Sequence, residues 1–144
     1  MKKIEHLGIA VKNMGTSNLL FEKLLGVAPY KQEEVTSEGV KTSFFMSGPN
    51  KIELLESIDS DGPIAKFLEK KGEGIHHVAF EVEDIVAEIE RLKGEGFTFI
   101  NETPKRGADN KLVTFVHPRT ANGVLIELCQ EAPPLNPLPK EGGT

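Results

Sequence analysis

Two histidines and two glutamates occupy matched places along the chain, and residues of these types can hold a divalent metal ion. The spacing from His6 to Glu53 is nearly the same as the spacing from His77 to Glu127. Neutral imidazoles and carboxylates suit borderline or hard ions such as Co, Ni, Mn, Fe or Zn, and they can leave coordination positions open for a chelating ligand. The pattern predicts a metal site formed by all four side chains.

The segments that carry these residues indicate that the chain is two copies of one module. Residues 4–11 read Ile-Glu-His-Leu-Gly-Ile-Ala-Val, and residues 75–82 read Ile-His-His-Val-Ala-Phe-Glu-Val. In each stretch the histidine is followed by a small residue two positions later and by valine five positions later. Both copies continue with a helix-like stretch, extended apolar stretches and a final Ile-Glu-Leu segment. A pseudo-twofold repeat would bring the two histidines and the two glutamates together.

Each candidate ligand, taken alone, also has a structural interpretation. A strand histidine such as His6 is usually a half-buried ring whose nitrogens bond to backbone groups. Glu53 and Glu127 each lie between apolar residues, where strand alternation can equally place a carboxylate on a solvated face. The recurrence of both pairs at matched places favours the metal site, because a solvated glutamate does not require it.

Other polar side chains have weaker claims to a functional role. His76 adjoins His77 and should point to the other side of the strand, so we interpret it as structural. His117 precedes a proline at a strand end, which indicates a turn residue or a pocket wall. Cys129 has no neighbouring base and is interpreted as packing. Four basic residues could meet an anionic substrate tail or remain solvated: Lys105, Arg106, Lys111 and Arg119.

Apolar spacing and capping residues predict three helices. The first begins near Asn13 or Thr16 and stops at a glycine, and its apolar stripe is formed by Leu20, Phe21, Leu24 and Leu25. Another is capped by Asp84 and stops at two glycines, and its apolar face is formed by Ile85, Ile89 and Leu92. Between them, residues 61–72 predict a linker helix with a proline in its first turn.

Stretches rich in β-branched and aromatic residues predict strands at residues 39–46, 51–55, 111–117 and 124–128. Each module then has the order β-α-β-β-β, and the predicted fold class is α+β. A histidine in the first strand and a glutamate in the last can share one concave face, because side chains alternate along a strand. We predict one domain over residues 1–131, with module 1 at about 1–58, the linker helix at about 61–72, module 2 at about 73–131 and a flexible Pro/Gly-rich tail at 132–144.

Composition narrows the class of protein. A chain of 144 residues fits one compact domain, and its one cysteine predicts no internal disulfide and a reducing cytoplasm. The net charge of -5 and the scattered basic residues argue against nucleic acid as a partner. No apolar run approaches twenty residues, so we expect no membrane association. A small molecule is the expected partner.

Several motifs resemble the vicinal oxygen chelate superfamily, which includes glyoxalases, bleomycin resistance proteins and dioxygenases, and within it the family of methylmalonyl-CoA epimerases. The resemblance spans roughly residues 3–130 and is carried by residues 6–11, 50–56 (Asn-Lys-Ile-Glu-Leu-Leu-Glu), 64–68, 72–79 (Gly-Glu-Gly-Ile-His-His-Val-Ala) and 117–128 (His-Pro-Arg-Thr-Ala-Asn-Gly-Val-Leu-Ile-Glu-Leu). It implies paired modules that cup a metal in a curved, mixed sheet. It also implies one divalent ion (Co, Mn, Ni, Zn or Mg), an acyl-CoA substrate, a homodimer and a ligand set of His6, Glu53, His77 and Glu127.

The activity implied by the resemblance is metal-dependent epimerisation of (2R)- and (2S)-methylmalonyl-CoA. The α-proton would leave to give a metal-stabilised enolate and would return on the opposite face, with Glu127 and then Glu53 as the expected catalytic groups. Some family members carry glutamine at the position of Glu53. Some have a further carboxylate, proposed as a catalytic base, where this chain has Thr42, which cannot serve as that base. The second acid/base group is therefore left open.

Two other functions fit the same fold. Glyoxalase I uses a similar site to shift a proton within a glutathione hemithioacetal. A metal-free binding protein, such as an antibiotic-sequestering resistance protein, holds its ligand without reaction. Such proteins commonly lack the full ligand set, whereas this chain retains all four candidates.

Overall fold

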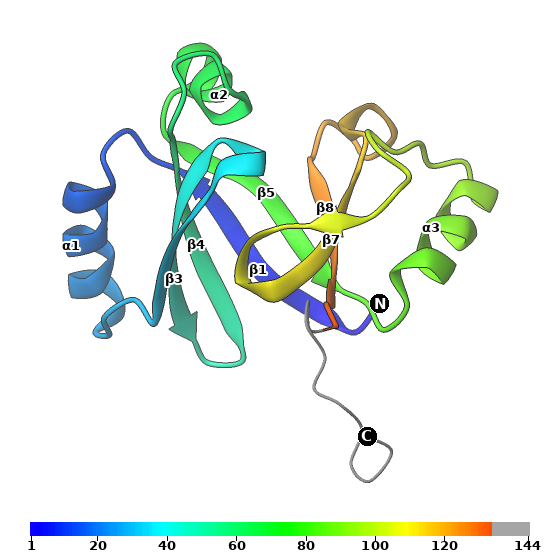
Figure 1. Ribbon diagram of the computed structural model, residues 1–144, viewed down its shortest axis with the longest axis horizontal. Helices are drawn as coiled ribbons and strands as arrows, with labels where there is room; N and C mark the ends of the chain where they lie inside the picture. The colour runs from blue at the N-terminus through cyan, green and yellow to red at the C-terminus, as the bar shows by residue number, and fades with distance from the viewer. Residues whose placement is uncertain (134–144) are drawn as a thin grey trace, which may run out of the picture.

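A mixed sheet of eight strands dominates the computed structural model, which describes residues 1–133 (Figure 1). The first half of the chain forms β1 (Lys3–Ala10), α1 (Met14–Leu25), β2 (Lys31–Val35), β3 (Val40–Ser47) and β4 (Asn50–Ser57). Helix α2 (Pro63–Lys71) connects it to β5 (Gly74–Glu81), α3 (Ile85–Gly94), β6 (Lys105–Arg106), β7 (Lys111–Val116) and β8 (Ile126–Glu131). Short 3-10 helices occur at Thr36–Glu38, Ala108–Asn110 and Pro118–Thr120. Both halves have the order β-α-β-β-β, which confirms the predicted α+β class.

The strand order of the sheet is symmetric about its centre. The order is β2-β3-β4-β1-β5-β8-β7-β6, with β1 and β5 antiparallel at the middle. Each of these central strands has a parallel neighbour, β4 beside β1 and β8 beside β5. The four strands that carry the two histidines and the two glutamates are therefore adjacent in the sheet. Figure 1 shows α1 and α3 at the two outer sides of the curved sheet.

The predicted caps and the predicted face of α3 are confirmed. The side chain of Asn13 accepts a hydrogen bond from the backbone N–H of Thr16, so Asn13, and not Thr16, caps α1. Asp84 accepts from the N–H of Ala87 at the start of α3. The apolar face of α3 is buried against the sheet, as its spacing predicts: Ile85, Ile89 and Leu92. The linker helix begins with Pro63, and its Ile64 is buried.

The apolar stripe predicted for α1 is only half correct. Phe21 and Leu25 pack with Met14 against the residues of the sheet, but Leu20 and Leu24 are 58% and 70% exposed. Residues 14, 21 and 25 follow one line along a helix, and this line faces the sheet. Leu20 and Leu24 are rotated away from it, which the run of leucines does not reveal.

The short edge strands were not located by the sequence patterns. Strand β2 reads Lys-Gln-Glu-Glu-Val and β6 is only two residues long, so neither has an apolar alternation. Apart from Ala132 and Pro133, the predicted tail at 132–144 lies outside the described residues. Within residues 1–133, no helix is both long enough and apolar enough to cross a bilayer.

Candidate metal centre

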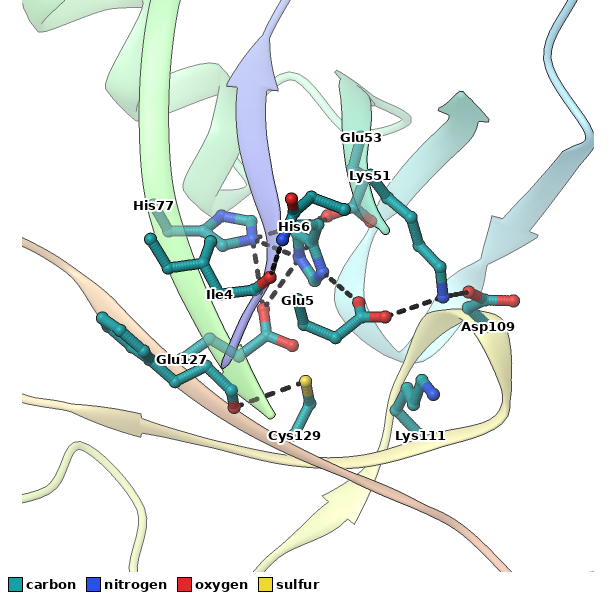
Figure 2. Close-up of polar contacts among 12 residues, drawn as sticks. Ile4, Glu5, His6, Lys51, Glu53, His77, Asp109, Lys111, Glu127 and Cys129 are labelled. Atoms are coloured by element: carbon teal, nitrogen blue, oxygen red, sulfur yellow. Dashed lines mark hydrogen bonds and ion pairs between the residues drawn. The ribbon is translucent and has the colours of Figure 1, made fainter. Parts of the chain in front are cut away.

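The four predicted ligands meet at the centre of the sheet (Figure 2). The Nε2 atom of His6 lies 3.0 Å from Nε2 of His77, 3.2 Å from Oε1 of Glu53 and 3.6 Å from Oε1 of Glu127. The Nε2 atom of His77 lies 3.4 Å from the same oxygen of Glu53 and 3.1 Å from that of Glu127. Each of the four residues is only 4–6% exposed. The side chains therefore form a compact, buried cluster of two nitrogens and two carboxylates.

Three members of the cluster form a group that can hold a metal ion. Ligand atoms of His6, His77 and Glu127 all lie within 4.8 Å of one another. Glu53 stands outside this trio, although its Oε1 atom contacts both histidines. In Figure 2 the ring of His6 lies between the two carboxylates. A mixed imidazole and carboxylate set of this kind suits a first-row divalent ion.

The small residue two positions after each histidine lies opposite the histidine of the other module. In the antiparallel pair of β1 and β5, Gly8 lies opposite His77 and Ala79 lies opposite His6. A Cβ atom added to Gly8 would lie 2.1 Å from Cε1 of His77. The ring of His77 can occupy its place only because residue 8 has no side chain. The spacing that the sequence repeats therefore sets each histidine beside a small residue of the other module.

A β-bulge precedes each histidine, and it corrects the prediction for His76. The pairing of β1 with β5 skips Glu5 on one strand and His76 on the other. A bulge interrupts side-chain alternation and re-aims the extra residue. Glu5 and His76 consequently lie next to the histidines that follow them, and both line the same cavity. The prediction that His76 points to the other side of the strand was wrong for this reason.

Mutual hydrogen bonds stabilise opposite charges within the cluster. Burial alone would lower the pKa of His77, but hydrogen bonds with Glu127 and Glu53 outweigh it and raise the pKa to about 9. Burial would raise the pKa of Glu127, yet the two histidines lower it to about 2. Glu53 has a lowered pKa and His6 a raised one through the same contacts. Both carboxylates are therefore held ionised.

This electrostatic arrangement fits a cation. In the protein alone, protons on the two imidazoles balance two buried carboxylates, which would otherwise be unpaired charges in a site of low dielectric. A divalent ion supplies the same positive charge and requires neutral imidazoles, so it would take the place of these protons. The converging Nε2 and Oε1 atoms are the atoms that such an ion binds.

The cluster lies in the wall of a cavity of about 350 Å³. Most of the lining is apolar and comes from both modules: Val40, Phe44, Leu55, Ile64, Phe115 and Leu125. Thr42 also lines the cavity, and its hydroxyl donates to the backbone oxygen of Glu33 at 3.4 Å. A largely apolar cavity with a few convergent polar groups is the usual form of a small-molecule site.

The remaining residues considered in the sequence lie in different places in the structure, and only some of them line the cavity. His117 is a turn residue, because its Nδ1 accepts from the N–H of Arg119 at the start of a 3-10 helix. Cys129 packs in the core, where burial raises the pKa of its thiol to about 12. Lys105 and Lys111 line the cavity; Lys105 forms an ion pair with Glu38, which also lines it, and Lys111 with the exposed Glu131. Neither Arg106 nor Arg119 belongs to the cavity lining.

Sequence reasoning missed a set of charged residues beside the histidines. Glu5 is 2% exposed and bonds both to His6 and to Lys51, and Lys51 in turn bonds to Asp109. Strand alternation placed Glu5 on the opposite face, and no sequence signal marks the bulge that turns it inward. The one available signal was position, since Glu5 and His76 immediately precede the two histidines of the repeat.

Comparison with known proteins assigns the chain to a family. The family model for the glyoxalase/bleomycin resistance protein/dioxygenase superfamily matches residues 5–115. The chain belongs to this superfamily. Within it, the chain belongs with the methylmalonyl-CoA epimerases, as a relative and two solved structures illustrate.

The ethylmalonyl-CoA/methylmalonyl-CoA epimerase of Cereibacter sphaeroides is 40% identical over 131 residues, which cover 89% of this chain and 97% of that protein. The crystal structure of methylmalonyl-CoA epimerase from Mycobacterium tuberculosis matches with a TM-score of 0.87 at 34% identity, covering 91% of this chain and 89% of that one. A variant of the Streptomyces coelicolor enzyme, in complex with 2-nitronate-propionyl-CoA, matches with a TM-score of 0.86 at 30% identity, covering 92% and 96%. The resemblance predicted from the motifs is confirmed.

Proposed function

We propose that this protein is a methylmalonyl-CoA epimerase, which interconverts the (2R) and (2S) forms by moving one α-proton. The observation that carries the proposal is the buried cluster of His6, His77, Glu127 and Glu53 in the wall of an apolar cavity. The relatives support it, because proteins of this name cover nearly the whole chain at 30–40% identity.

One divalent ion would be held by the two histidines and Glu127, with Glu53 as the fourth ligand. When bound, it supplies a Lewis acid that stabilises the negative charge formed as the α-proton leaves. Co, Mn, Ni and Zn are compatible with a mixed set of nitrogen and oxygen ligands, so the donor set does not choose among them, whereas two imidazoles disfavour Mg, which prefers oxygen ligands.

Glu127 and Glu53 are the proposed proton-transfer groups. Inversion at the α-carbon requires that a proton leaves from one face and returns to the other. Glu127 comes from β8 of the second module and Glu53 from β4 of the first, so the carboxylates approach the histidines from opposite halves of the sheet. Their contacts with the histidines keep both ionised, which is the form that accepts a proton. We assign Glu127 as the first base, which takes the α-proton. Glu53 is its counterpart, which must take up a proton from solvent before it can return one to the opposite face.

Thr42 contributes a hydroxyl to the cavity wall, and this hydroxyl cannot act as an acid or a base near neutral pH. Its hydroxyl donates to a backbone oxygen and can orient a bound group, but it cannot remove a proton from carbon. The proposal therefore assigns both proton transfers to the pair of glutamates.

The apolar cavity suits the acyl end of the substrate. Phe44, Leu55, Ile64 and Phe115 would contact the methyl branch and the thioester carbons. One relative carries both ethylmalonyl-CoA and methylmalonyl-CoA in its name, so the ethyl homologue is a second substrate to test. A homodimer and a cytoplasmic location remain predictions.

The decisive experiment follows the α-carbon of the substrate in deuterated water. Protein reconstituted with Co²⁺ is incubated with (2R)- or with (2S)-methylmalonyl-CoA, and inversion and α-deuteration are both measured. We expect metal-dependent inversion with uptake of deuterium, and loss of both after treatment with a chelator. Activity on the glutathione hemithioacetal of methylglyoxal instead would indicate glyoxalase I, and ligand binding without metal or turnover would indicate a sequestering protein.

The role of Glu127 is tested by Glu127→Gln. Loss of the base is expected to reduce α-proton exchange by about 100-fold or more, the usual contribution of a general base. Glu90→Gln is the matched control, since Glu90 lies on α3 with a side chain that is 70% exposed. Near-normal exchange in a metal-loaded Glu127→Gln protein would remove Glu127 from this role.

A further inference from the structure

The residue before each histidine touches the ring nitrogen that faces away from the centre. Oε1 of Glu5 lies 2.7 Å from Nδ1 of His6, while Nε2 of the same ring faces the other three ligands. Nδ1 of His76 lies 2.9 Å from Nδ1 of His77, whose Nε2 also faces the centre. An ionised carboxylate can only accept, so Nδ1 of His6 donates to Glu5 and its Nε2 is free to bind a cation.

The two contacts occupy equivalent places in the two modules. Both residues are the extra members of β-bulges in the central β1–β5 pair. Since bulges re-aim side chains at functional sites, their occurrence before both histidines is a feature of the repeat and not an accident of one strand. Figure 2 shows Glu5 beside His6, on the side away from His77.

Lys51 of the first module balances the charge of Glu5, and Lys51 is bound in turn by Asp109, in a loop of the second module. Nζ of Lys51 lies 2.7 Å from Oε2 of Glu5 and 3.1 Å from Oδ2 of Asp109. Asp109 is anchored in turn by the hydroxyl of Tyr30 at 2.8 Å, and its backbone N–H donates to Glu33 at 2.7 Å. Buried Glu5 is thus fixed on both of its oxygens.

In the sequence repeat, too, the charge of the bulge residue is matched by a residue on the glutamate-bearing strand of the same module. Lys51 lies two positions before Glu53, and the equivalent position before Glu127 is Leu125. Where the bulge residue is the carboxylate Glu5, the first module supplies a lysine, and where it is the imidazole His76, the second module supplies an apolar residue. The lysine accompanies the carboxylate, as a buried negative charge requires.

We infer that Glu5 and His76 are positioning residues of the metal centre, Glu5 for His6 and His76 for His77, and that Lys51 and Asp109 hold Glu5 in place. Hydrogen bonds to the outer nitrogen of a ligand histidine fix the orientation of the ring, and their loss typically weakens metal binding 10- to 100-fold. The contact with a carboxylate is charge-assisted and stronger than one between two imidazoles. His6 is therefore the more firmly held ligand. The inference rests on the proposed metal centre.

The test is direct binding of Co²⁺ to the full chain, measured by competition with a chromophoric chelator. We expect Glu5→Gln to weaken binding 10- to 100-fold, and His76→Gln to weaken it less. The double variant Glu5→Gln with Lys51→Met removes both charges, and we expect it to remain as weak as Glu5→Gln. Glu81→Gln is the matched control, because Glu81, at the end of β5, also pairs with a lysine, Lys2, at 3.4 Å, which lies just before β1.

A second measurement separates positioning from a general loss of structure. In the Co²⁺ protein, the ring N–H protons of the two ligand histidines are expected as exchangeable, strongly shifted proton NMR signals. Glu5→Gln should accelerate solvent exchange of one of them and leave the other unchanged. Co²⁺ binding by Glu5→Gln within twofold of the unsubstituted protein, with unchanged exchange, would overturn the inference. Absence of Co²⁺ binding to the unsubstituted protein would overturn the metal centre itself, and the inference with it.

Discussion

At the scale of single residues, the sequence identifies the four side chains that form the cluster but not the neighbouring residues that hydrogen-bond to them. The repeat is sufficient to select His6, Glu53, His77 and Glu127, and the structure brings these side chains together. Glu5 could not be selected in the same way, because regular alternation assigns it to the opposite face of β1. Only the pairing of two strands creates a bulge, and this pairing is not encoded in the local pattern.

Gly8 provides a prediction at this scale. Gly8→Ala would place a methyl group against the ring of His77, which must then move out of the cluster. We expect Co²⁺ affinity to fall at least about tenfold and the free energy of unfolding to fall by about 1–3 kcal/mol, as for other overpacked sites. Chelator competition and urea unfolding measure the two effects.

The control for Gly8→Ala is Gly94→Ala. An added Cβ at Gly94 meets no atom within 4 Å, and the residue lies at the end of α3. This variant should bind Co²⁺ like the unsubstituted protein. Equal affinities for both alanine variants would show that the close approach of His77 to Gly8 is not required for the site.

At the scale of elements, prediction succeeded where one face of a segment is strongly apolar. Helix α3 and strands β3, β4, β7 and β8 were located because apolar residues recur at the period of each structure. The edge strands β2 and β6 were missed, since an edge strand is held by hydrogen bonds to one neighbour and needs few apolar side chains. The exact apolar face of α1 also failed, because leucines at neighbouring positions fit more than one contact line.

Helix α1 allows the corrected contact line to be tested. Phe21 packs on Phe45, with ring centroids 6.4 Å apart, whereas Leu20 is 58% exposed. Phe21→Ala should lower the free energy of unfolding by about 2 kcal/mol or more, because it removes packed apolar surface. Leu20→Ala should change it by less than about 0.5 kcal/mol. Urea unfolding of both variants decides the matter, and equal losses would restore the stripe expected from the sequence.

At the scale of the whole molecule, the cluster lies where the two modules meet. β1 and β5 form the central pair, so each histidine is packed against the backbone of the other module. Farther out, Asp109 of the second module is bound by Lys51 and Tyr30 of the first. Asp109 and Asn110 have positive φ angles of 59° and 56°, a conformation that is uncommon for residues other than glycine. These contacts tie the second module's loop to the centre.

The buried charges predict how the stability of the metal-free protein depends on pH. The pKa of His77 is about 9 in the folded state, above its ordinary value of 6.5. The proton on His77 therefore stabilises the fold fully below about pH 6.5, and this contribution is lost as the pH rises through 9. Glu127 has a folded pKa of about 2, below its ordinary value of 4.5. Its contribution is present above pH 4.5 and is lost as the pH falls toward 2.

His76 acts in the opposite sense, because burial and the neighbouring His77 lower its pKa to about 4, so its contribution is present above pH 6.5 and is lost as the pH falls through 4. Metal-free protein should accordingly be most stable near pH 6.5. Raising the pH from about 6 to about 9.5 should lower the free energy of unfolding by up to about 3 kcal/mol, from the shift of His77 alone. Urea unfolding in the presence of a chelator measures this change. His77→Gln is the control, because it lacks this ring and should lose less stability over the same range. The raised pKa of His6 adds a loss that both proteins share. If both proteins respond equally to pH, the alkaline loss does not come from His77, and the ion pairs of His77 with Glu53 and Glu127 do not stabilise the fold.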